Sequence, residues 1–391
     1  RVDRRQRQMC IRDRNILMRN RILTGAVAIA SVAAISFGTV STASAAPAYK
    51  PYPHQIHNMV APKAKISQGY FTSASPEHPK IYYKYNTVAK PKAAIVVVHG
   101  LAEHSGRYDY LTYRLNLAGF SVYRMDHRGH GKSVEPYTKT KKGNVNSFDY
   151  LVDDVHHVLM TAKAQNKGKK VFVIGHSMGS FATEMLETKY PTDMDGTITN
   201  GGGIPWNPYG KNTLQPKMIT AKGLPAANTK LDPTISEKLP LDKILSFKGV
   251  LPTVLTEKQT RKAPLTSPDA LTKIDIPNKL AGGVCSDTKI AEEYQKDPLN
   301  SNSFTASTVV QMLNGLLYAT YNAKAYTRPT LIMHGQKDGL VPSYMAINWA
   351  NAIGSKDKEF IFWVGLMHET MNEVVRDEVI NYVINWVNRH L

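Results

Sequence analysis

The sequence predicts an α/β fold: a mainly parallel central sheet with helices on both faces and one inserted helical cap. Short apolar runs alternate with amphipathic stretches over residues 76–203 and again over 327–391, which is the pattern of strands joined by helices. Between them, residues 204–326 are rich in Pro, Lys and Thr and contain few strand-like runs. At 391 residues the chain has room for one large domain with such an insertion. We therefore expect one α/β core in two segments, with residues 204–326 forming the cap.

Residues 1–45 have the features of a processing signal rather than of a folded domain. Residues 18–21 form a short cationic segment, residues 22–40 are apolar, and residues 43–45 (Ala-Ser-Ala) match a small-residue cleavage pattern. We expect the residues before this cationic segment to be spurious upstream translation. Cleavage near Ala45/Ala46 is expected to release a bacterial protein that is secreted or associated with the cell envelope. The alternative is a segment retained as a membrane anchor.

The composition is basic. The formal net charge is +18, and without residues 1–45 the remaining 41 basic and 29 acidic residues leave about +12. Such an exterior favours peripheral contact with an anionic envelope or membrane surface. No segment matches a nucleic-acid-binding module, so we expect no nucleic-acid partner.

Cys285 is the one cysteine after the predicted signal, which leaves no intrachain disulfide. A packed structural thiol is the simplest interpretation.

Apolar runs and helical periodicity predict the individual elements in order. Residues 46–75 are Pro-rich and weakly patterned, and they predict a linker before the first strand. A helix over residues 147–163 is predicted by apolar residues at helical spacing after an N-cap at Ser147. A capping box over residues 370–373 (TMNE) predicts the start of the last helix. Continuous apolar runs, typical of strands buried on both faces, predict strands over residues 93–98, 120–125, 171–174, 330–334 and 360–364.

The segment Gly175-His176-Ser177-Met178-Gly179 directly follows one of these strands and precedes a helix-compatible run. A G-x-S-x-G sequence in this context predicts a nucleophile on a sharp strand-to-helix turn, as in the α/β-hydrolase fold. Both glycines are expected because neighbouring backbone comes too close for a side chain. The alternative is a glycine-flanked turn serine without a catalytic role. The strand before the turn and the helix after it favour Ser177 as the nucleophile.

A serine hydroxyl needs a base to remove its proton and a carboxylate to orient that base. In this fold the acid and the histidine follow the nucleophile in that order, each after a later strand. Asp338 follows the predicted strand over residues 330–334, and His368 follows the strand over residues 360–364. Both lie at the carboxyl ends of their strands, where the sites of open α/β sheets form. The prediction is a triad of Ser177, Asp338 and His368 that needs no metal and no organic cofactor.

Two backbone N–H groups are also needed to stabilise the oxyanion that forms on the substrate. Met178, directly after the nucleophile, is expected to supply one. The second is expected from the loop after the strand over residues 93–98. Leu101 is the predicted donor there, because Gly100 lets the backbone come close.

The segment over residues 126–131 has carboxylate and imidazole groups at metal-like spacing, but a Gly-rich turn held by polar side chains is the simpler interpretation.

Residues 99–108 (HGLAEHSGRY) resemble the H-G-x-x-E-H-S-x-R-Y segment of monoacylglycerol lipases and bacterial lysophospholipases, the serine aminopeptidase S33-type hydrolases. Further similar segments follow in the same order: residues 126–133 (DHRGHGKS), 175–179 (GHSMG), 297–299 (DPL) and 334–342 (HGQKDGLVP). The resemblance covers roughly residues 80–390 and is thinnest over residues 204–280. It implies the α/β-hydrolase fold, the same triad and oxyanion donors, and a helical cap that lines an acyl pocket. The supporting motif residues that it picks out are His99, Gly100, Glu103, His104, Gly175, His176 and Gly179.

Two departures from the family pattern bear on function. Ser180 stands where the family usually has a second Gly after the turn, and the long cap, which shapes the pocket, is hard to align.

Taken together, the triad and the resemblance predict a secreted serine carboxylic-ester hydrolase, with a monoacylglycerol, a lysophospholipid or another medium-sized acyl ester as substrate. The first alternative is an aminopeptidase-type peptide hydrolase of the same fold, which an acidic cluster that binds a free amine would favour. The second is a non-catalytic binding protein, against which an intact turn and triad argue.

Overall fold

The computed structural model describes residues 56–224 and 266–391. The predicted signal segment, its cleavage site, the first part of the predicted linker and part of the predicted cap lie outside these residues. Within the described part of the chain, no helix has both the length and the apolar character needed to cross a bilayer.

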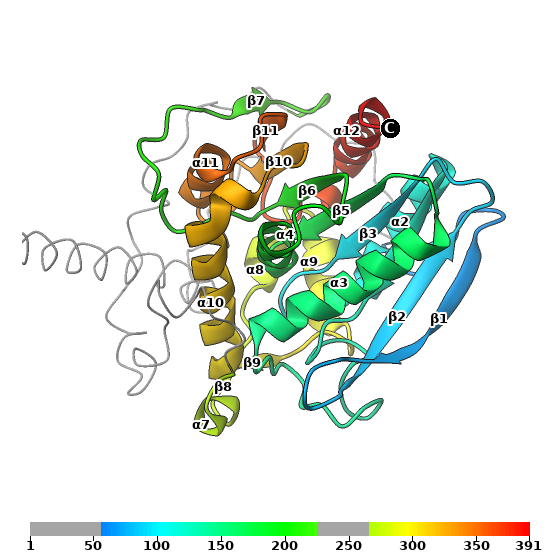
Figure 1. Ribbon diagram of the computed structural model, residues 1–391, viewed down its shortest axis with the longest axis vertical. Coiled ribbons are helices and arrows are strands. Elements are labelled where there is room, and N and C mark those ends of the chain that lie inside the picture. The colour runs from blue at the N-terminus through cyan, green and yellow to red at the C-terminus, as the bar shows by residue number, and fades with distance from the viewer. Residues whose placement is uncertain (1–55, 225–265) are drawn as a thin grey trace, which may run out of the picture.

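A nine-stranded sheet forms the centre of the molecule. Its strands are β1 (Lys65–Thr72), β2 (Lys80–Thr87), β3 (Ala93–Val98), β4 (Phe120–Met125), β5 (Val171–His176), β6 (Gly196–Asn200), β7 (Lys217–Ile219), β10 (Thr330–Gly335) and β11 (Lys358–Trp363). Their order is β1-β2-β4-β3-β5-β6-β10-β11-β7 (Figure 1). β2 pairs antiparallel with both β1 and β4, and all other neighbours are parallel. The predicted mainly parallel sheet is confirmed.

Helices cover both faces of this sheet. One face carries α3 (Phe148–Gln165), α4 (Met178–Lys189) and α11 (Ser343–Ala352), and the other carries α2 (Asp109–Leu117) and α12 (Arg376–Arg389). α10 (Ala306–Asn322) packs against α4 and α3. Side chains of β3 alternate between the two layers: Val96 belongs to the core beneath α3 and α4, whereas Ile95 and Val97 belong to the core beneath α2 and α12. As predicted, Ser147 caps α3, its hydroxyl accepting a hydrogen bond from the Tyr150 N–H at 3.4 Å.

The described part of the predicted cap contains short elements that lead into α10. They are α7 (Asp269–Thr272), β8 (Asp275–Pro277), α8 (Ala281–Val284), α9 (Thr288–Lys296) and β9 (Ser303–Thr305). β8 and β9 form a separate antiparallel pair. The described residues also include the 3-10 helices η1 (Ser105–Tyr108), η4 (Ala323–Ala325) and η5 (Thr370–Asn372). The extent of the cap, residues 204–326, stays a prediction, although β7 within this range joins the sheet beside β11.

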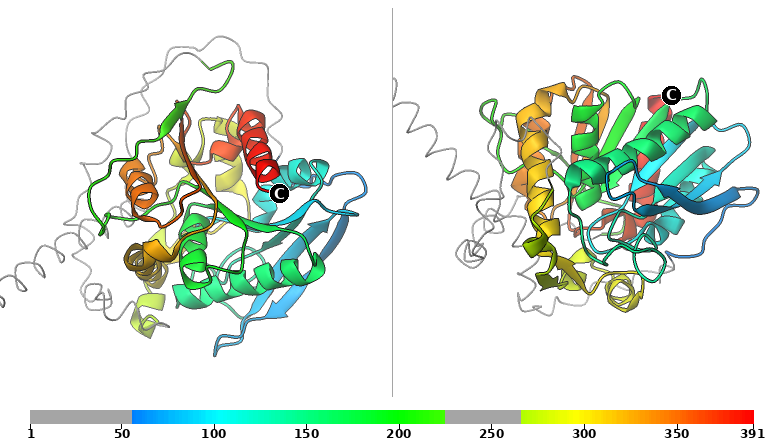
Figure 2. Two further views of the ribbon diagram at one scale, coloured as in Figure 1. Left: turned by 45° about the horizontal axis from the view of Figure 1, so that its top comes forward. Right: turned by 60° about the horizontal axis from the view of Figure 1, so that its bottom comes forward.

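The linker prediction for residues 46–75 is wrong at its C-terminal end, because β1 lies there. β1 forms a hairpin with β2 at one edge of the sheet, the blue strands in Figure 2. No residue of β1 is buried. An edge strand with both faces partly in solvent has no need of the apolar pattern that marks the inner strands.

The predicted start of the last helix is also wrong. Thr370 and Glu373 form no capping box: the segment from Thr370 is the turn η5, and α12 begins at Arg376. Both side chains make contacts with distant parts of the chain instead. The Thr370 hydroxyl donates to Asn200 Oδ1 at 2.6 Å, and the Glu373 carboxylate accepts from the Ser286 N–H at 3.2 Å.

Candidate active site

Ser177 occupies a strained turn between β5 and α4. Its backbone angles are φ 54° and ψ −123°, a left-handed conformation that non-glycine residues rarely adopt. A Cβ on Gly175 would lie 2.4 Å from the Gly179 carbonyl oxygen, and a Cβ on Gly179 would lie 2.1 Å from the Val98 carbonyl oxygen. The two glycines are therefore required by close backbone contacts, as predicted. The turn leaves Ser177 half-buried, facing a pocket.

His368 and Asp338 form a buried pair, and His368 lines the same pocket. His368 Nδ1 donates to Asp338 Oδ2 at 2.7 Å. Burial opposes ionisation of Asp338, but His368 and His334 outweigh it and lower the pKa of the carboxyl to about 2. Burial also disfavours a charged His368, but the Asp338 carboxylate outweighs it and raises the pKa of the imidazole. The loops after β5, β10 and β11 thus bring the three predicted triad residues to one edge of the sheet.

The loop after β3 lies against the nucleophile. A Cβ on Gly100 would be 3.1 Å from Ser177 Cβ. The Gly100 N–H donates to Glu103 Oε1 at 2.6 Å, so the next N–H along the loop, that of Leu101, is the candidate for substrate. Met178 begins α4, and a first-turn N–H has no acceptor within its own helix. Both predicted oxyanion donors therefore line the pocket, while their role stays a prediction.

His99 ties this loop to the turn after β4. Its Nδ1 contacts the Gly100 carbonyl at 2.8 Å, and its Nε2 accepts from the His127 N–H at 2.9 Å. Burial lowers the pKa of His99 well below its usual value, so the ring is neutral. Asp126 accepts backbone hydrogen bonds from Ser105 and Lys132, both at 2.8 Å. The segment over residues 126–131 is thus a turn held by polar side chains, as predicted.

Two buried carboxylates border the pocket, and Arg107 binds both. Arg107 Nη1 donates to Glu103 Oε2 at 2.6 Å and to Glu369 Oε1 at 2.7 Å, and its Nη2 donates to Glu369 Oε2 at 3.1 Å. The Tyr108 hydroxyl donates to Glu103 Oε1 at 2.7 Å. Burial opposes ionisation of Glu369, but Arg107 outweighs it and lowers the pKa to about 2. The sequence prediction named Glu103 but missed Arg107 and Glu369 as its partners.

Asn200, at the end of β6, connects the nucleophile turn to the histidine loop. Its Nδ2 lies 2.9 Å from His176 Nδ1 and donates to the His368 carbonyl at 3.0 Å. Asn200 is fully buried. Sequence reasoning missed this residue, although its position at a strand end before Gly201-Gly202-Gly203 was an available signal.

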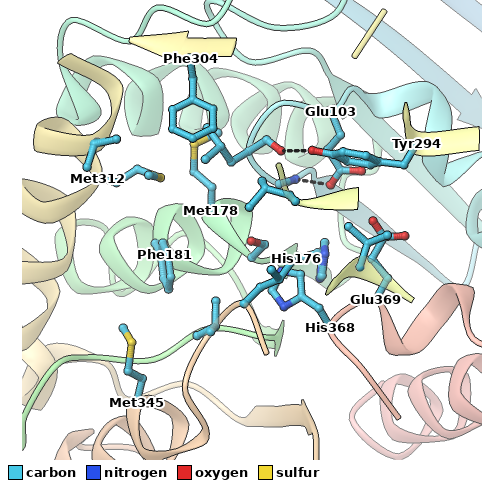
Figure 3. A pocket seen from close by; sticks show the side chains of 18 of the residues that line it. Glu103, His176, Met178, Phe181, Tyr294, Phe304, Met312, Met345, His368 and Glu369 are labelled. Carbon is cyan, nitrogen blue, oxygen red and sulfur yellow. Dashed lines mark hydrogen bonds between the residues drawn. The ribbon is translucent and has the colours of Figure 1, made fainter. Parts of the chain in front are cut away.

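The pocket has an apolar and a polar end (Figure 3). Phe181 and Met178 of α4, Met312 of α10 and Phe304 lie on one side of the site in this view, and Glu103, Glu369, Tyr294 and His176 lie on the other. An apolar end of this kind suits a hydrocarbon chain, and the polar groups can orient a head group. α8 and α9 contribute Val284 and Tyr294 to the lining.

One group of possible metal ligands occurs in the described part of the chain: His57, His104 and Asp297. His104 Nδ1 accepts from the Gly106 N–H at 3.1 Å, so a neutral His104 carries its proton on Nε2, which donates to Asp297 Oδ2 at 2.8 Å. In this tautomer Nε2 has no lone pair for a metal. His57 faces the Gly106 carbonyl with Nδ1, at 3.2 Å, and the Glu293 carboxylate with Nε2, an arrangement that fits an imidazolium.

The model of the serine aminopeptidase S33 family matches residues 89–375 of this chain. The chain belongs to this family. Among curated relatives, the monoacylglycerol lipase of Mycolicibacterium smegmatis is 25% identical over 314 residues, covering 80% of this chain and 93% of the relative. A phospholipase of Bacillus subtilis is 25% identical over 291 residues, covering 74% of this chain and 93% of the relative.

The solved structures that resemble this chain have the same fold. A soluble variant of the monoglyceride lipase of Saccharomyces cerevisiae, in complex with a substrate analog, matches with a TM-score of 0.58 and 20% identity. The match covers 87% of this chain and 98% of that one. The predicted α/β-hydrolase fold and the resemblance to the monoacylglycerol lipase group are confirmed. The chain is an α/β-hydrolase of the lipase and esterase type.

Proposed function

We propose that this protein is a serine carboxylic-ester hydrolase that cleaves monoacylglycerols or similar medium-sized lipid esters through an acyl-enzyme. The observation that carries the proposal is the strained turn that presents Ser177 to a pocket shared with the buried His368–Asp338 pair. The apolar end of that pocket supports a hydrocarbon acyl chain. The relatives that are named monoacylglycerol lipase and phospholipase support a lipid ester.

In the proposed first half-reaction, Ser177 Oγ attacks the ester carbonyl carbon while His368 Nε2 takes the hydroxyl proton. The carbonyl electron pair moves onto its oxygen, which accepts hydrogen bonds from the Leu101 and Met178 N–H groups. When the tetrahedral intermediate collapses, the bond to the alcohol oxygen breaks and His368 returns the proton to that oxygen. The alcohol leaves, and the acyl group remains on Ser177.

In the second half-reaction, His368 takes a proton from water as the water oxygen attacks the acyl-serine ester. Collapse of the second intermediate breaks the bond to Ser177 Oγ, which recovers its proton from His368, and the carboxylic acid leaves. Asp338 holds His368 with its proton on Nδ1 and stabilises the imidazolium that forms twice in each cycle. This scheme uses no metal and no organic cofactor.

An aminopeptidase activity is the main alternative. It would need a carboxylate that is free to bind the α-amine of a peptide. Glu103 and Glu369 are the carboxylates in the pocket lining, and Arg107 engages both of them. Because both carboxylates are held by Arg107, neither is left free to bind an α-amine, which favours the ester substrate.

The test compares p-nitrophenyl esters from acetate to palmitate with aminoacyl p-nitroanilides, using the Ser177→Ala protein as the blank. The proposal predicts ester hydrolysis with an optimum at medium or long acyl chains and little turnover of the anilides. Faster turnover of the anilides would replace it with the peptidase alternative. A protein that turns over neither class and is not labelled by a serine-directed phosphonate would be a binding protein.

The proposal also includes export to the cell envelope or medium. It is supported by the cationic segment, the apolar stretch and the small-residue cleavage pattern within residues 18–45. Cell fractionation followed by N-terminal sequencing tests it: a mature protein that starts near Ala46 and is found outside the cytoplasm is the expected result. A cytoplasmic protein that retains residues 18–45 would contradict it.

A further inference from the structure

Asn200 ends β6 and lies between the two loops that carry the proposed nucleophile and the proposed base. Its backbone pairs with that of His176 in the parallel ladder of β5 and β6. The Asn200 carbonyl accepts from the Ser177 N–H at 2.9 Å, so its main chain holds the nucleophile itself. The side chain is fully buried and donates to the carbonyl of His368. One residue thus contacts the backbone of both catalytic residues.

Three hydrogen bonds hold the side-chain amide of Asn200 in one orientation. A backbone carbonyl can only accept, so the atom that lies 3.0 Å from the His368 carbonyl oxygen is the amide nitrogen. Oδ1 accepts from the Thr370 hydroxyl at 2.6 Å, which agrees with this orientation. The amide nitrogen also lies 2.9 Å from His176 Nδ1, which accepts from it, because burial lowers the pKa of His176 to about 3 and keeps the ring neutral. The amide therefore holds the histidine loop at two residues and the nucleophile turn at one.

Ser180, which stands where the family usually has a glycine, holds the main chain of Asn200. Its hydroxyl oxygen accepts from the Asn200 N–H at 3.0 Å. The same hydroxyl lies 2.8 Å from the Gly175 carbonyl oxygen and 3.0 Å from that of Asn200, so either can accept its proton. Ser180 is fully buried in the first turn of α4. The end of β6 is thus bound to the nucleophile turn by a side chain that glycine would lack.

The other backbone hydrogen bonds next to His368 lead to different parts of the protein. The Met367 N–H donates to Glu373 Oε1 at 2.8 Å, within the same loop region. The Glu369 N–H donates to the Val284 carbonyl at 2.6 Å, which belongs to α8. Neither of these two bonds reaches the nucleophile turn, whereas the bonds to the Asn200 side chain do so through one residue.

The position of the His368 ring depends on its backbone as well as on Asp338. The bond from Nδ1 to Asp338 Oδ2, at 2.7 Å, holds one edge of the ring. It does not fix the distance from Nε2 to Ser177, because the loop that carries the ring could still shift. Proton transfer requires the two atoms to be within hydrogen-bond reach, and a misplacement of about 1 Å can cost about 10²-fold in rate. A contact that ties the His368 backbone to the nucleophile turn therefore bears directly on the rate.

We propose that Asn200 is a positioning residue: its amide holds the backbone of His368 where the imidazole can take the proton of Ser177. This inference rests on the proposed triad mechanism and deepens it by adding a residue that acts through His368. Asn200 is not among the residues that line the pocket. Its loss should therefore lower kcat, which depends on proton transfer, and leave KM nearly unchanged.

The experiment measures kcat, KM and the thermal midpoint for the wild type, Asn200→Leu and Thr197→Val, with a medium-chain p-nitrophenyl ester. Leu has nearly the shape of Asn but forms no side-chain hydrogen bonds, so kcat should fall by about 10-fold to 100-fold with KM within about threefold of the wild type. Thr197→Val is the matched control. Thr197 is buried in the same strand, and its hydroxyl bonds to Glu187 and Thr330, away from the histidine loop. Both variants should lose thermal stability, but Thr197→Val should keep the wild-type kcat.

An unchanged kcat in Asn200→Leu would overturn the positioning role and leave ester hydrolysis intact. An equal fall of kcat in both variants would also overturn it, since the loss would then follow stability alone. If Asn200→Leu does not fold, Thr370→Val takes its place, because it removes the hydroxyl that holds Oδ1. Its kcat should fall by about twofold to tenfold, the range for one lost hydrogen bond, and a wild-type kcat would contradict the inference.

A wild type that does not turn over the ester would instead overturn the proposed function. The rate at which a serine-directed phosphonate labels Ser177 then decides the role of Asn200, because labelling needs His368 as base but no particular ester. Labelling slower by about 10-fold or more in Asn200→Leu supports the positioning role, and equal rates contradict it. A wild type that is not labelled at all would overturn both proposals.

Discussion

The Oδ2 atom of Asp338 lies 2.7 Å from Nδ1 of His368, and both side chains are buried. The other carboxylate oxygen accepts backbone hydrogen bonds from Leu340 and Val341, both at 2.9 Å. The loop that carries Asp338 thus fixes the orientation of the carboxylate, and the carboxylate in turn orients the imidazole. Because Nδ1 donates to it, Nε2 of a neutral His368 is the nitrogen with the free lone pair.

Replacing Asp338 by Asn is expected to lower kcat by about 10³–10⁴-fold, because the amide stabilises the wrong tautomer of His368 and no longer offsets its charge. Asn is nearly isosteric, and its oxygen can still accept from the Leu340 and Val341 N–H groups. The thermal midpoint by circular dichroism should therefore change little. A variant that keeps more than about a tenth of wild-type kcat would remove Asp338 from the mechanism.

The pH dependence of kcat/KM follows from the direction of the His368 shift. Burial disfavours the charged ring, but Asp338 outweighs it and raises the pKa above the ordinary value of 6.5. The base must be unprotonated to accept the serine proton, so activity should fall as pH drops through this raised pKa. In Asp338→Asn the midpoint should move to lower pH. An unshifted midpoint, measured with an uncharged ester, would contradict the assignment.

Gly179→Ala is expected to destabilise the protein by about 1–3 kcal/mol, the usual cost of overpacking. The new Cβ would lie 2.1 Å from the Val98 carbonyl oxygen, and backbone cannot move aside as a side-chain end can. Gly282→Ala is the control, because nothing lies within 4 Å of a Cβ at that position. Chemical denaturation of the two variants should give a clear loss for the first and at most a small change for the second.

His57 should stabilise the fold in a pH-dependent way. Burial opposes its charge, but the hydrogen bond and charge of Glu293 outweigh it and raise the pKa above 6.5. A raised pKa means that this stabilisation is complete below the unfolded-state value and is lost as pH rises through the folded-state value. His57→Gln should therefore lower the free energy of unfolding by on the order of 1 kcal/mol near pH 5.5 and have little effect near pH 9. Equal effects at both pH values would contradict an imidazolium at this position.

The inner strands could be predicted from the sequence because burial on both faces requires continuous apolar runs, as in Ala93–Val98. The turn around Ser177 could be predicted because close backbone contacts require its two glycines. A side chain on Gly175 would meet the Gly179 carbonyl, and a side chain on Gly179 would meet the carbonyl of Val98 in the adjacent strand. Asp338 and His368 followed from chain order within one fold. In each case the sequence carries a recognisable signal: an apolar run, a short motif or a fixed order of motifs.

The features that were missed depend on contacts between distant segments. Asn200 meets the carbonyl of His368, which is 168 residues further along the chain, and Arg107 meets Glu369 across a separation of 262 residues. Thr370 and Glu373 have the local sequence of a helix cap, but tertiary hydrogen bonds to Asn200 and Ser286 use their side chains instead. Edge strand β1 was missed because exposure removes the apolar signal.

The central claim is that Ser177 is the nucleophile, and the most direct test is turnover of a medium-chain p-nitrophenyl ester by wild type and Ser177→Ala at matched concentration. The replacement keeps the backbone of the turn and removes one oxygen, so the fold should be retained. We predict a fall in kcat of at least about 10⁴-fold together with loss of phosphonate labelling. A folded Ser177→Ala protein that hydrolyses the ester at a rate within tenfold of the wild type would contradict the claim.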